Sequence, residues 1–254
     1  MNNIPVKPPF FGYKSFDIAS EGLLNVLSHK VLFEGRWGFS KRNLSDEEYR
    51  DIIENKAKPA LEAFIEKEKS DPVIQCKATY GYYQCRSEGN SIKLFNKYAT
   101  LARYWFPRQK KEPKLCLADF INSDQDDVIA CFAVTLGSRI IEEEKKLFAA
   151  NKYYEYHLLH GLGAELADCA AVCVHRRIHH ELYPELSVLE NKLAGCRYSF
   201  GYPSCPDLSN QKSLLTILDA SKIGLSLTES FEMVPELSVS GFIIFNKYAC
   251  HIVP

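Results

Sequence analysis

The chain has 254 residues, of which 46% are hydrophobic, enough to build one large domain or two small ones. Its 31 basic and 32 acidic residues give a formal net charge of −1, which leaves no electrostatic case for a nucleic-acid partner. The sequence contains no apolar stretch of about 18 residues and no signal-peptide pattern, so we expect no membrane span and a cytoplasmic location. The nine cysteines are odd in number and form no Cys-x-x-Cys pair, so we expect reduced thiols.

The first third of the chain predicts one helix and then a hairpin. Ser45 and Glu48 form a capping box, and apolar residues recur behind it at helical spacing to about Lys67. Pro59 should bend this helix or split it in two. From Val73 to Phe95 the β-branched and aromatic content rises on both sides of a Glu-Gly-Asn turn, which is typical of a hairpin.

The rest of the chain mixes strands and helices. The apolar runs Leu115–Phe120 and Val128–Thr135 have the length of strands and are separated by a polar turn. The later predicted elements are helices at Arg139–Ala149, at about Tyr153–Leu182 and at Leu214–Leu218, and a strand at Ser238–Phe245. These elements predict an α+β fold, and no Pro-rich linker marks an internal domain boundary.

The long helix carries a polar cluster. Asp168, His175 and His179 follow the spacing i, i+7, i+11, which places them on one face beside an apolar stripe that should pack on the sheet. Asp168 should therefore lie at the edge of the core. There its carboxylate either meets the ammonium or hydroxyl groups of a ligand or pairs with Arg or His on a solvated face.

His175 and His179 also have the i, i+4 spacing of a helical metal pair. The intervening Arg176 and Arg177 oppose a divalent cation, so we expect polar surface at the end of the helix, with a metal-dependent enzyme as an alternative. Gly161-Leu-Gly163 lacks the third glycine of a dinucleotide-binding loop.

The segment of residues 197–207, Arg-Tyr-Ser-Phe-Gly-Tyr-Pro-Ser-Cys-Pro-Asp, is the most informative stretch. Arg197 offers a planar fork that can grip a carboxylate through two hydrogen bonds. Gly201 permits unusual backbone dihedrals or a close approach to a ligand, and Pro203 fixes the backbone nearby. Cys205 has no evident base to activate it, which favours a structural or ligand-adjacent thiol. Taken alone, the segment is also compatible with a surface turn.

Segments along the chain share their order with one known family. They include Leu32-Phe-Glu-Gly-Arg-Trp-Gly38, Tyr80-Gly-Tyr82, Phe106-Pro-Arg-Gln109, Leu115–Phe120, Phe132–Thr135, residues 162–168 followed by His175-Arg-Arg177, residues 197–207, Ile223–Phe231 and Ser238–Phe242. Together they resemble the activation domain of cobalamin-dependent methionine synthase, from about Leu32 to Ile252. The resemblance implies a twisted antiparallel sheet flanked by helices, with residues 1–30 as an N-terminal leader and residues 31–254 as the domain.

The resemblance also implies an S-adenosylmethionine site. In that site Arg197 would grip the methionine carboxylate, Tyr202 would pack on the ligand, the backbone near Ser199 would contact the nucleoside, and Asp168 would take the amino or ribose groups. The remaining implied positions are Gly201, His29, His251 and Ile252. The family has an acidic residue at the position of His29, an aromatic pair at His251 and Ile252, and usually Glu at Asp168.

The function implied by the resemblance is reactivation of a partner. The chain would support the reductive methylation of cob(II)alamin carried by a methionine synthase core, with a flavodoxin-type protein as electron donor. It has no room for the other methionine synthase modules, so it would be either a free-standing or an excised reactivation module. Met1 and the leader favour a free-standing protein, which we expect to have no turnover of its own. An alternative is an accessory module for another corrinoid protein, with weak or no S-adenosylmethionine binding.

Overall fold

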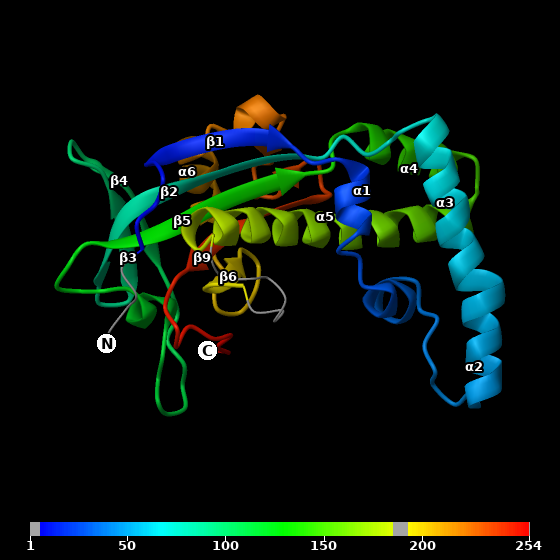
Figure 1. Cartoon of the computed structure of the whole chain (residues 1–254), viewed down its shortest axis with the longest axis horizontal. Helices are drawn as coiled ribbons and strands as arrows, with labels where there is room; N and C mark the ends of the chain where they lie inside the picture. Colours follow the sequence, from blue (N-terminus) through cyan, green and yellow to red (C-terminus); the bar gives the residue numbers. More distant parts are fainter. Residues whose placement is uncertain (1–5, 185–192, 254) are drawn as a thin grey trace.

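A twisted antiparallel sheet forms the centre of the computed structural model, which describes residues 6–184 and 193–253 (Figure 1). Within these residues the order of its seven strands is β4-β3-β2-β5-β9-β6, and β1 pairs with the same edge of β2 as β3 does. The strands are β1 (Gly12–Asp17), β2 (Lys77–Glu88), β3 (Ser91–Phe95), β4 (Thr100–Trp105), β5 (Asp127–Thr135), β6 (Cys196–Ser199) and β9 (Ser238–Ile244), and a separate ribbon is formed by β7 (Ser226–Leu227) and β8 (Met233–Val234). The expected α+β class with an antiparallel sheet is confirmed.

Helices cover both faces of this sheet. The α-helices are α1 (Ser20–Leu24), α2 (Asp46–Ile52), α3 (Lys58–Ser70), α4 (Arg139–Ala149), α5 (Tyr153–Leu182) and α6 (Gln211–Ile217). Shorter helical segments are η1 (Val31–Arg36), η2 (Ile53–Ala57), η3 (Leu117–Phe120), η5 (Leu208–Asn210) and η6 (Ala220–Ile223). The predicted α4 and α5 are confirmed, as are the hairpin of β2 and β3, the strands β5 and β9, and a helix at α6.

The central strand β5 explains why both faces are apolar. Ala130, Phe132 and Val134 point into the core beneath α5, whereas Ile129 and Cys131 point into a second core on the α6 side. All are inaccessible to solvent, because successive side chains of a strand leave on opposite faces and each face is covered. Figure 1 shows α5 running along one face of the sheet and α6 lying on the other side.

The helix predicted from the capping box at Ser45 forms in two parts. Ser45 and Glu48 cap each other as expected. The helix then passes through the π-helical turn η2 directly into α3, in which Pro59 is the second residue. Pro59 therefore marks the start of α3, consistent with the predicted bend or split.

The strand predicted at Leu115–Phe120 is wrong. Residues 117–120 form the short helix η3, because the Asp119 carboxylate accepts a hydrogen bond from the backbone N–H of Cys116 at 2.9 Å. Arg108 grips the same carboxylate through both Nη atoms at 2.6 and 2.9 Å. These polar contacts close the chain into a turn despite its apolar composition.

Five strands were not anticipated, namely β1, β4, β6, β7 and β8, and two of them bear on the site and the leader. β1 lies within the segment expected to be a leader, yet it pairs with β2 from Gly12 opposite Tyr82 to Asp17 opposite Lys77. β6 has only four residues and pairs with β9. Both are short edge strands, so their sequences lack the long alternation that identifies a strand.

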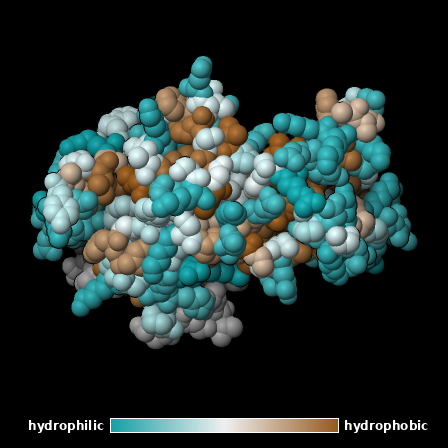
Figure 2. Space-filling view, turned by 90° about the horizontal axis from the view of Figure 1, so that it is seen from above, coloured by the Kyte–Doolittle hydropathy of each residue, from teal (hydrophilic) through white to brown (hydrophobic). Residues whose placement is uncertain are grey.

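Helix α5 is the core helix of the fold. By length and composition it is the one helix of the described residues that could cross a membrane, but 61% of its most apolar window is buried against the protein. Gly161 and Gly163 let neighbours pack closely, since an added Cβ would lie 2.9 Å from Trp37 and 2.4 Å from Leu237. Seen from above, hydrophilic side chains surround separate apolar patches on the surface (Figure 2).

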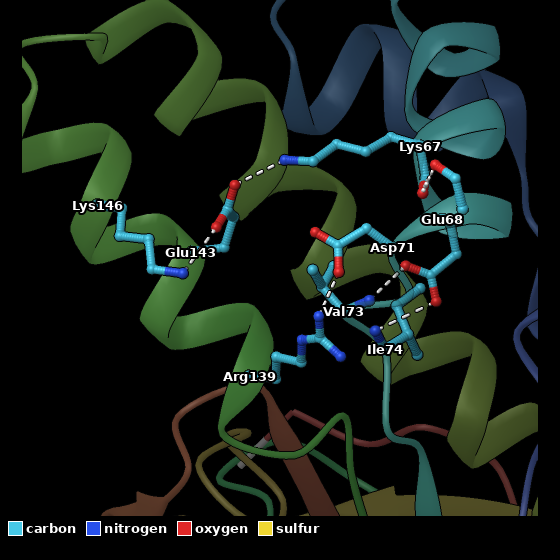
Figure 3. A network of polar contacts seen from close by, with 9 residues as sticks. Lys67, Glu68, Asp71, Val73, Ile74, Arg139, Glu143 and Lys146 are labelled. Carbon is cyan, nitrogen blue, oxygen red and sulfur yellow. Dashed lines mark hydrogen bonds and ion pairs between the residues drawn. The ribbon is translucent and has the colours of Figure 1, made fainter.

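The helical arm of α2 and α3 is attached to the body by a polar network at the end of α3 (Figure 3). The buried Glu68 carboxylate accepts hydrogen bonds from the backbone N–H groups of Val73 at 2.8 Å and Ile74 at 3.2 Å. Asp71, the residue after α3, forms a separate ion pair with Arg139 of α4. Glu68 thus shapes the turn that leads from α3 into β2.

Two histidines of α5 fix the chain just before β6. His175 Nε2 lies 2.8 Å from the Ala194 carbonyl oxygen, and the Ala194 N–H donates to His179 Nδ1 at 3.0 Å. Both rings are buried, so the expectation that His179 belongs to polar surface is wrong. The sequence neighbour Glu181 is also engaged, accepting hydrogen bonds from Tyr80 at 2.5 Å and Tyr82 at 2.8 Å.

We predict that Glu68→Ala lowers the free energy of unfolding by about 2–4 kcal/mol, because it leaves two buried N–H groups without their charged acceptor. Glu66→Ala is the matched control on the same helix. Its side chain is 72% exposed in a pair with Lys69, so the change should stay within about 0.5 kcal/mol. Urea unfolding followed by circular dichroism measures both, and equal effects of the two variants would contradict this role of Glu68.

Acid should destabilise the fold through His175. Burial lowers the pKa of His175 to about 4, from an ordinary value of 6.5, so the unfolded chain binds a proton between these values and the folded chain does not. Stability is therefore lost as the pH falls through this window, by about 2 kcal/mol from this group between pH 7.5 and pH 5.

The measurement is the difference in unfolding free energy between pH 7.5 and pH 5. His175→Gln removes the titrating ring and should reduce this difference, while its amide can still donate to the Ala194 carbonyl. His157→Gln, at an exposed position of the same helix, is the control. A pH dependence that His175→Gln leaves untouched would rule out His175 as its source.

Candidate functional site

A cavity of about 420 Å³ lies where β6, α5 and the C-terminal segment meet. Its walls come from the middle of α5, from β6 and the turn that follows, and from the last described residues. The lining residues are Asp168, Arg197, Tyr198, Ser199, Tyr202, Pro203, Ser204, His251, Ile252 and Val253. Six of the eight residues predicted for the site thus come together.

The register of β6 decides which side chains face the cavity. Tyr198 is buried on the α6 side and donates a hydrogen bond to the Cys250 carbonyl at 2.8 Å, so Arg197 and Ser199 leave on the α5 side. Opposite Ser199 lies Gly241, where an added Cβ would be 2.0 Å from the Tyr198 carbonyl oxygen. Only glycine allows this approach, which explains the glycine in the segment Ser238–Phe242.

Arg197 is a half-buried cation. Burial lowers the pKa of its guanidinium, and the nearby Asp168 carboxylate opposes this shift. Within residues 6–184 and 193–253, no carboxylate forms an ion pair with Arg197. A half-buried guanidinium without a carboxylate partner is suited to bind the carboxylate of a ligand.

Asp168 faces the cavity and is held from behind by Arg36. Arg36 Nη2 lies 2.7 Å from Asp168 Oδ2, and Arg36 Nε lies 3.2 Å from Glu165 Oε2. Burial raises the pKa of Glu165, and Arg36 opposes that shift. Sequence reasoning placed Asp168 at the site but missed Arg36, which lies inside the quoted segment Leu32–Gly38.

The turn after β6 places Tyr202 at the cavity mouth. Gly201 has φ +88°, a conformation that suits glycine, and its N–H donates to the Cys205 carbonyl at 3.0 Å. Gly201 therefore shapes the turn without lining the cavity. Tyr202 is 60% exposed, whereas Cys205 is buried, which raises the pKa of its thiol to about 12. A thiol with that pKa is a poor nucleophile at neutral pH.

The C-terminal segment forms the opposite wall. His251 is exposed, and its ring meets Tyr198 edge-on at 5.8 Å between centroids, while Ile252 is buried. His29 does not reach this cavity. Its ring stacks on Phe33 at 5.4 Å, and it lines a separate depression with Glu34 and Tyr49.

Metal ligation finds no support in the described residues. No group of three or more His, Cys, Asp or Glu side chains among residues 6–184 and 193–253 is arranged to hold an ion. His175 Nε2 and His179 Nδ1 each contact the backbone of Ala194. The helical histidine pair therefore serves the fold.

Residues 29–251 match the family model described as "Vitamin B12 dependent methionine synthase, activation domain". The chain is 32% identical to methionine synthase of Mycobacterium tuberculosis and 30% identical to that of Mycobacterium leprae, in each case over 95% of its own length. It spans only 23% and 22% of these two relatives.

A solved structure, the MetH reactivation domain bound to AdoHcy (S-adenosylhomocysteine), superimposes with a TM-score of 0.86. The two share 22% sequence identity, and the match covers 99% of this chain and 83% of the other, so it establishes the fold. The family match extends over most of the sequence, from the segment before η1 to the cavity wall. The chain belongs to the family of vitamin B12-dependent methionine synthase activation domains.

Proposed function

We propose that the chain binds S-adenosylmethionine in the cavity of Arg197 and supports the reductive methylation of cob(II)alamin in a methionine synthase core. The observation that carries this proposal is a cationic side chain without a carboxylate partner, facing an acidic side chain across one cavity. The ligand has both complementary groups, a carboxylate and an ammonium. A structure with the same fold is bound to S-adenosylhomocysteine, the product of methyl transfer.

Each predicted residue of the cavity wall has a proposed role in binding. Arg197 grips the methionine carboxylate with two hydrogen bonds, and Asp168 accepts from the amino group or the ribose. The backbone at Ser199 contacts the nucleoside, and Tyr202 covers the ligand at the mouth. His251 and Ile252 form the remaining wall. Gly201 acts through the turn, and His29 has no place in the site.

The partners are proposed from the family. The relatives are four to five times longer than this chain, so the cobalamin belongs to a methionine synthase core outside it. The corrin supplies the cobalt chemistry, while this chain binds and orients the methyl donor. A flavodoxin-type protein in the cytoplasm would supply the electron. An accessory role for another corrinoid protein is an outcome of the tests below.

Arg197→Ala should weaken S-adenosylhomocysteine binding by about 30- to 150-fold, because it removes a charge-assisted bidentate contact of about 2–3 kcal/mol. Arg197→Lys should recover only part of the affinity, since an ammonium cannot reproduce the fork. Isothermal titration calorimetry measures the affinities, and circular dichroism checks the fold. Unchanged binding by a folded Arg197→Ala variant would remove the proposed site.

Asp168 should contribute through its charge. Asp168→Asn should weaken binding about threefold to thirtyfold, and Asp168→Glu should keep or improve it, since the carboxylate remains. The same titration measures both variants. If Asp168→Asn binds like the unaltered chain, Asp168 serves only its pair with Arg36.

The isolated chain should form no methionine from S-adenosylmethionine and homocysteine. Activity should require both a cobalamin-loaded synthase core and a low-potential electron donor, and should consume about one S-adenosylmethionine per rescued cobalamin. Methionine formation and absorbance of the corrin are the readouts. Sustained methyl transfer by the chain with cobalamin shown to be absent would make it a methyltransferase in its own right.

A further inference from the structure

Asp168 in the cavity wall forms one continuous arrangement with two charged side chains behind it. Arg36 lies between Glu165 and Asp168, bonding to the first through Nε and to the second through Nη2. Trp37 anchors the segment that carries Arg36, since its indole N–H donates to the Leu158 carbonyl at 2.8 Å. The position of Arg36 relative to α5 is therefore fixed by packing as well as by charge.

Only one acidic side chain among the described residues lines the cavity, and that is Asp168. Arg36 offsets its charge at 2.7 Å and is shared with the more buried Glu165 at 3.2 Å. The other charged lining residue, Arg197, has the sign that repels a cation. A ligand that adds a positive charge next to these groups therefore gains little attraction from the cavity.

We propose that Arg36 sets the charge preference of this cavity, by cancelling Asp168 so that a cationic sulfonium ligand gains no advantage over its neutral thioether. This inference rests on the proposed function, because it assumes that S-adenosylmethionine and S-adenosylhomocysteine bind at Arg197. The two ligands share every group except the methyl that makes the sulfonium positive. Their ratio of dissociation constants therefore isolates the charge effect.

The test measures both ligands by calorimetry against the full chain and variants of the pair. The unaltered chain should bind the two ligands within about threefold of each other. Arg36→Gln keeps a donor for the carboxylates but removes the cation, so it should shift the ratio about fivefold toward the sulfonium ligand. Arg36→Lys keeps the charge and should leave the ratio near that of the unaltered chain.

Asp168→Asn should shift the ratio of the dissociation constants in the opposite direction. It removes one of the two carboxylates that Arg36 binds, the one that lines the cavity, so the ratio should shift toward the thioether by a similar factor. Contacts that Asp168 makes to the shared amino or ribose groups cancel in the ratio. Arg139→Gln is the control, because Arg139 forms an equivalent pair with Asp71 away from the cavity.

The test also needs a control for a change in the protonation of Glu165. Burial raises the pKa of Glu165, so loss of Arg36 favours protonation of that carboxyl and changes a second charge. Repeating the variants in a Glu165→Gln background leaves only Asp168 and Arg36 to set the charge behind the cavity. The opposite shifts of Arg36→Gln and Asp168→Asn should persist there.

The possible outcomes distinguish failure of the role of Arg36 from failure of the proposed function. Binding of both ligands with a ratio that Arg36→Gln and Asp168→Asn leave unchanged overturns the role of Arg36 alone. A shift of the ratio in the same direction by both variants also overturns it, since it would reflect altered packing. Failure of the unaltered chain to bind either ligand overturns the proposed function and this inference with it.

Discussion

The close approach of β6 to β9 at Gly241 is the constraint on which the site depends. A side chain at position 241 would overlap the carbonyl of Tyr198, so the pairing of these strands requires glycine there. Once the strands pair, the alternation of β6 sends Tyr198 into the core and Arg197 toward α5. The position of the guanidinium is thus a consequence of backbone contact at a residue that never touches the cavity.

Helix α5 is the second support, and it serves the core and the site together. Its small residues, including Gly161 and Gly163, allow the segment around Trp37 and the side chain of Leu237 to pack against it. Asp168, on the face of α5 that also carries His175 and His179, lies in the cavity wall beside β6. His175 and His179 hold the chain before that strand. One helix therefore both holds the chain that leads into β6 and contributes Asp168 to the cavity wall.

The long, strongly periodic elements were predictable from sequence, because their burial pattern is recorded in consecutive residues. The bounds of α5 and the strand around Phe132 illustrate this. The turn at Asp119 was mistaken for a strand, since its carboxylate outweighs the apolar run around it. β6 escaped prediction because four residues are too few to show alternation.

The site was predictable where its residues cluster in the segment beginning at Arg197, and through the family resemblance at Asp168 and His251. Arg36 was not, because its partners Glu165 and Asp168 lie 129 and 132 residues away and no local pattern records such a contact. His29 was placed at the site by counting along the chain. In the structure its ring stacks on Phe33 and faces a different depression, since counting cannot anticipate how the π-helical segment η1 turns.

Arg108 and Arg197 both lie in motifs shared with the family, but their surroundings differ. Arg108 is saturated: both Nη atoms bind Asp119, and Asn90 accepts from Nε at 3.1 Å. This raises the pKa of Arg108, so its charge stabilises the fold. Burial instead lowers the pKa of Arg197, and no described carboxylate forms an ion pair with it. The nearby Asp168 carboxylate offsets the desolvation of Arg197 only in part, so this guanidinium contributes less to folding than one held in an ion pair. Arg197 thus differs from Arg108 in lining the cavity without a described ion pair, which makes it the candidate for contact with an anionic group.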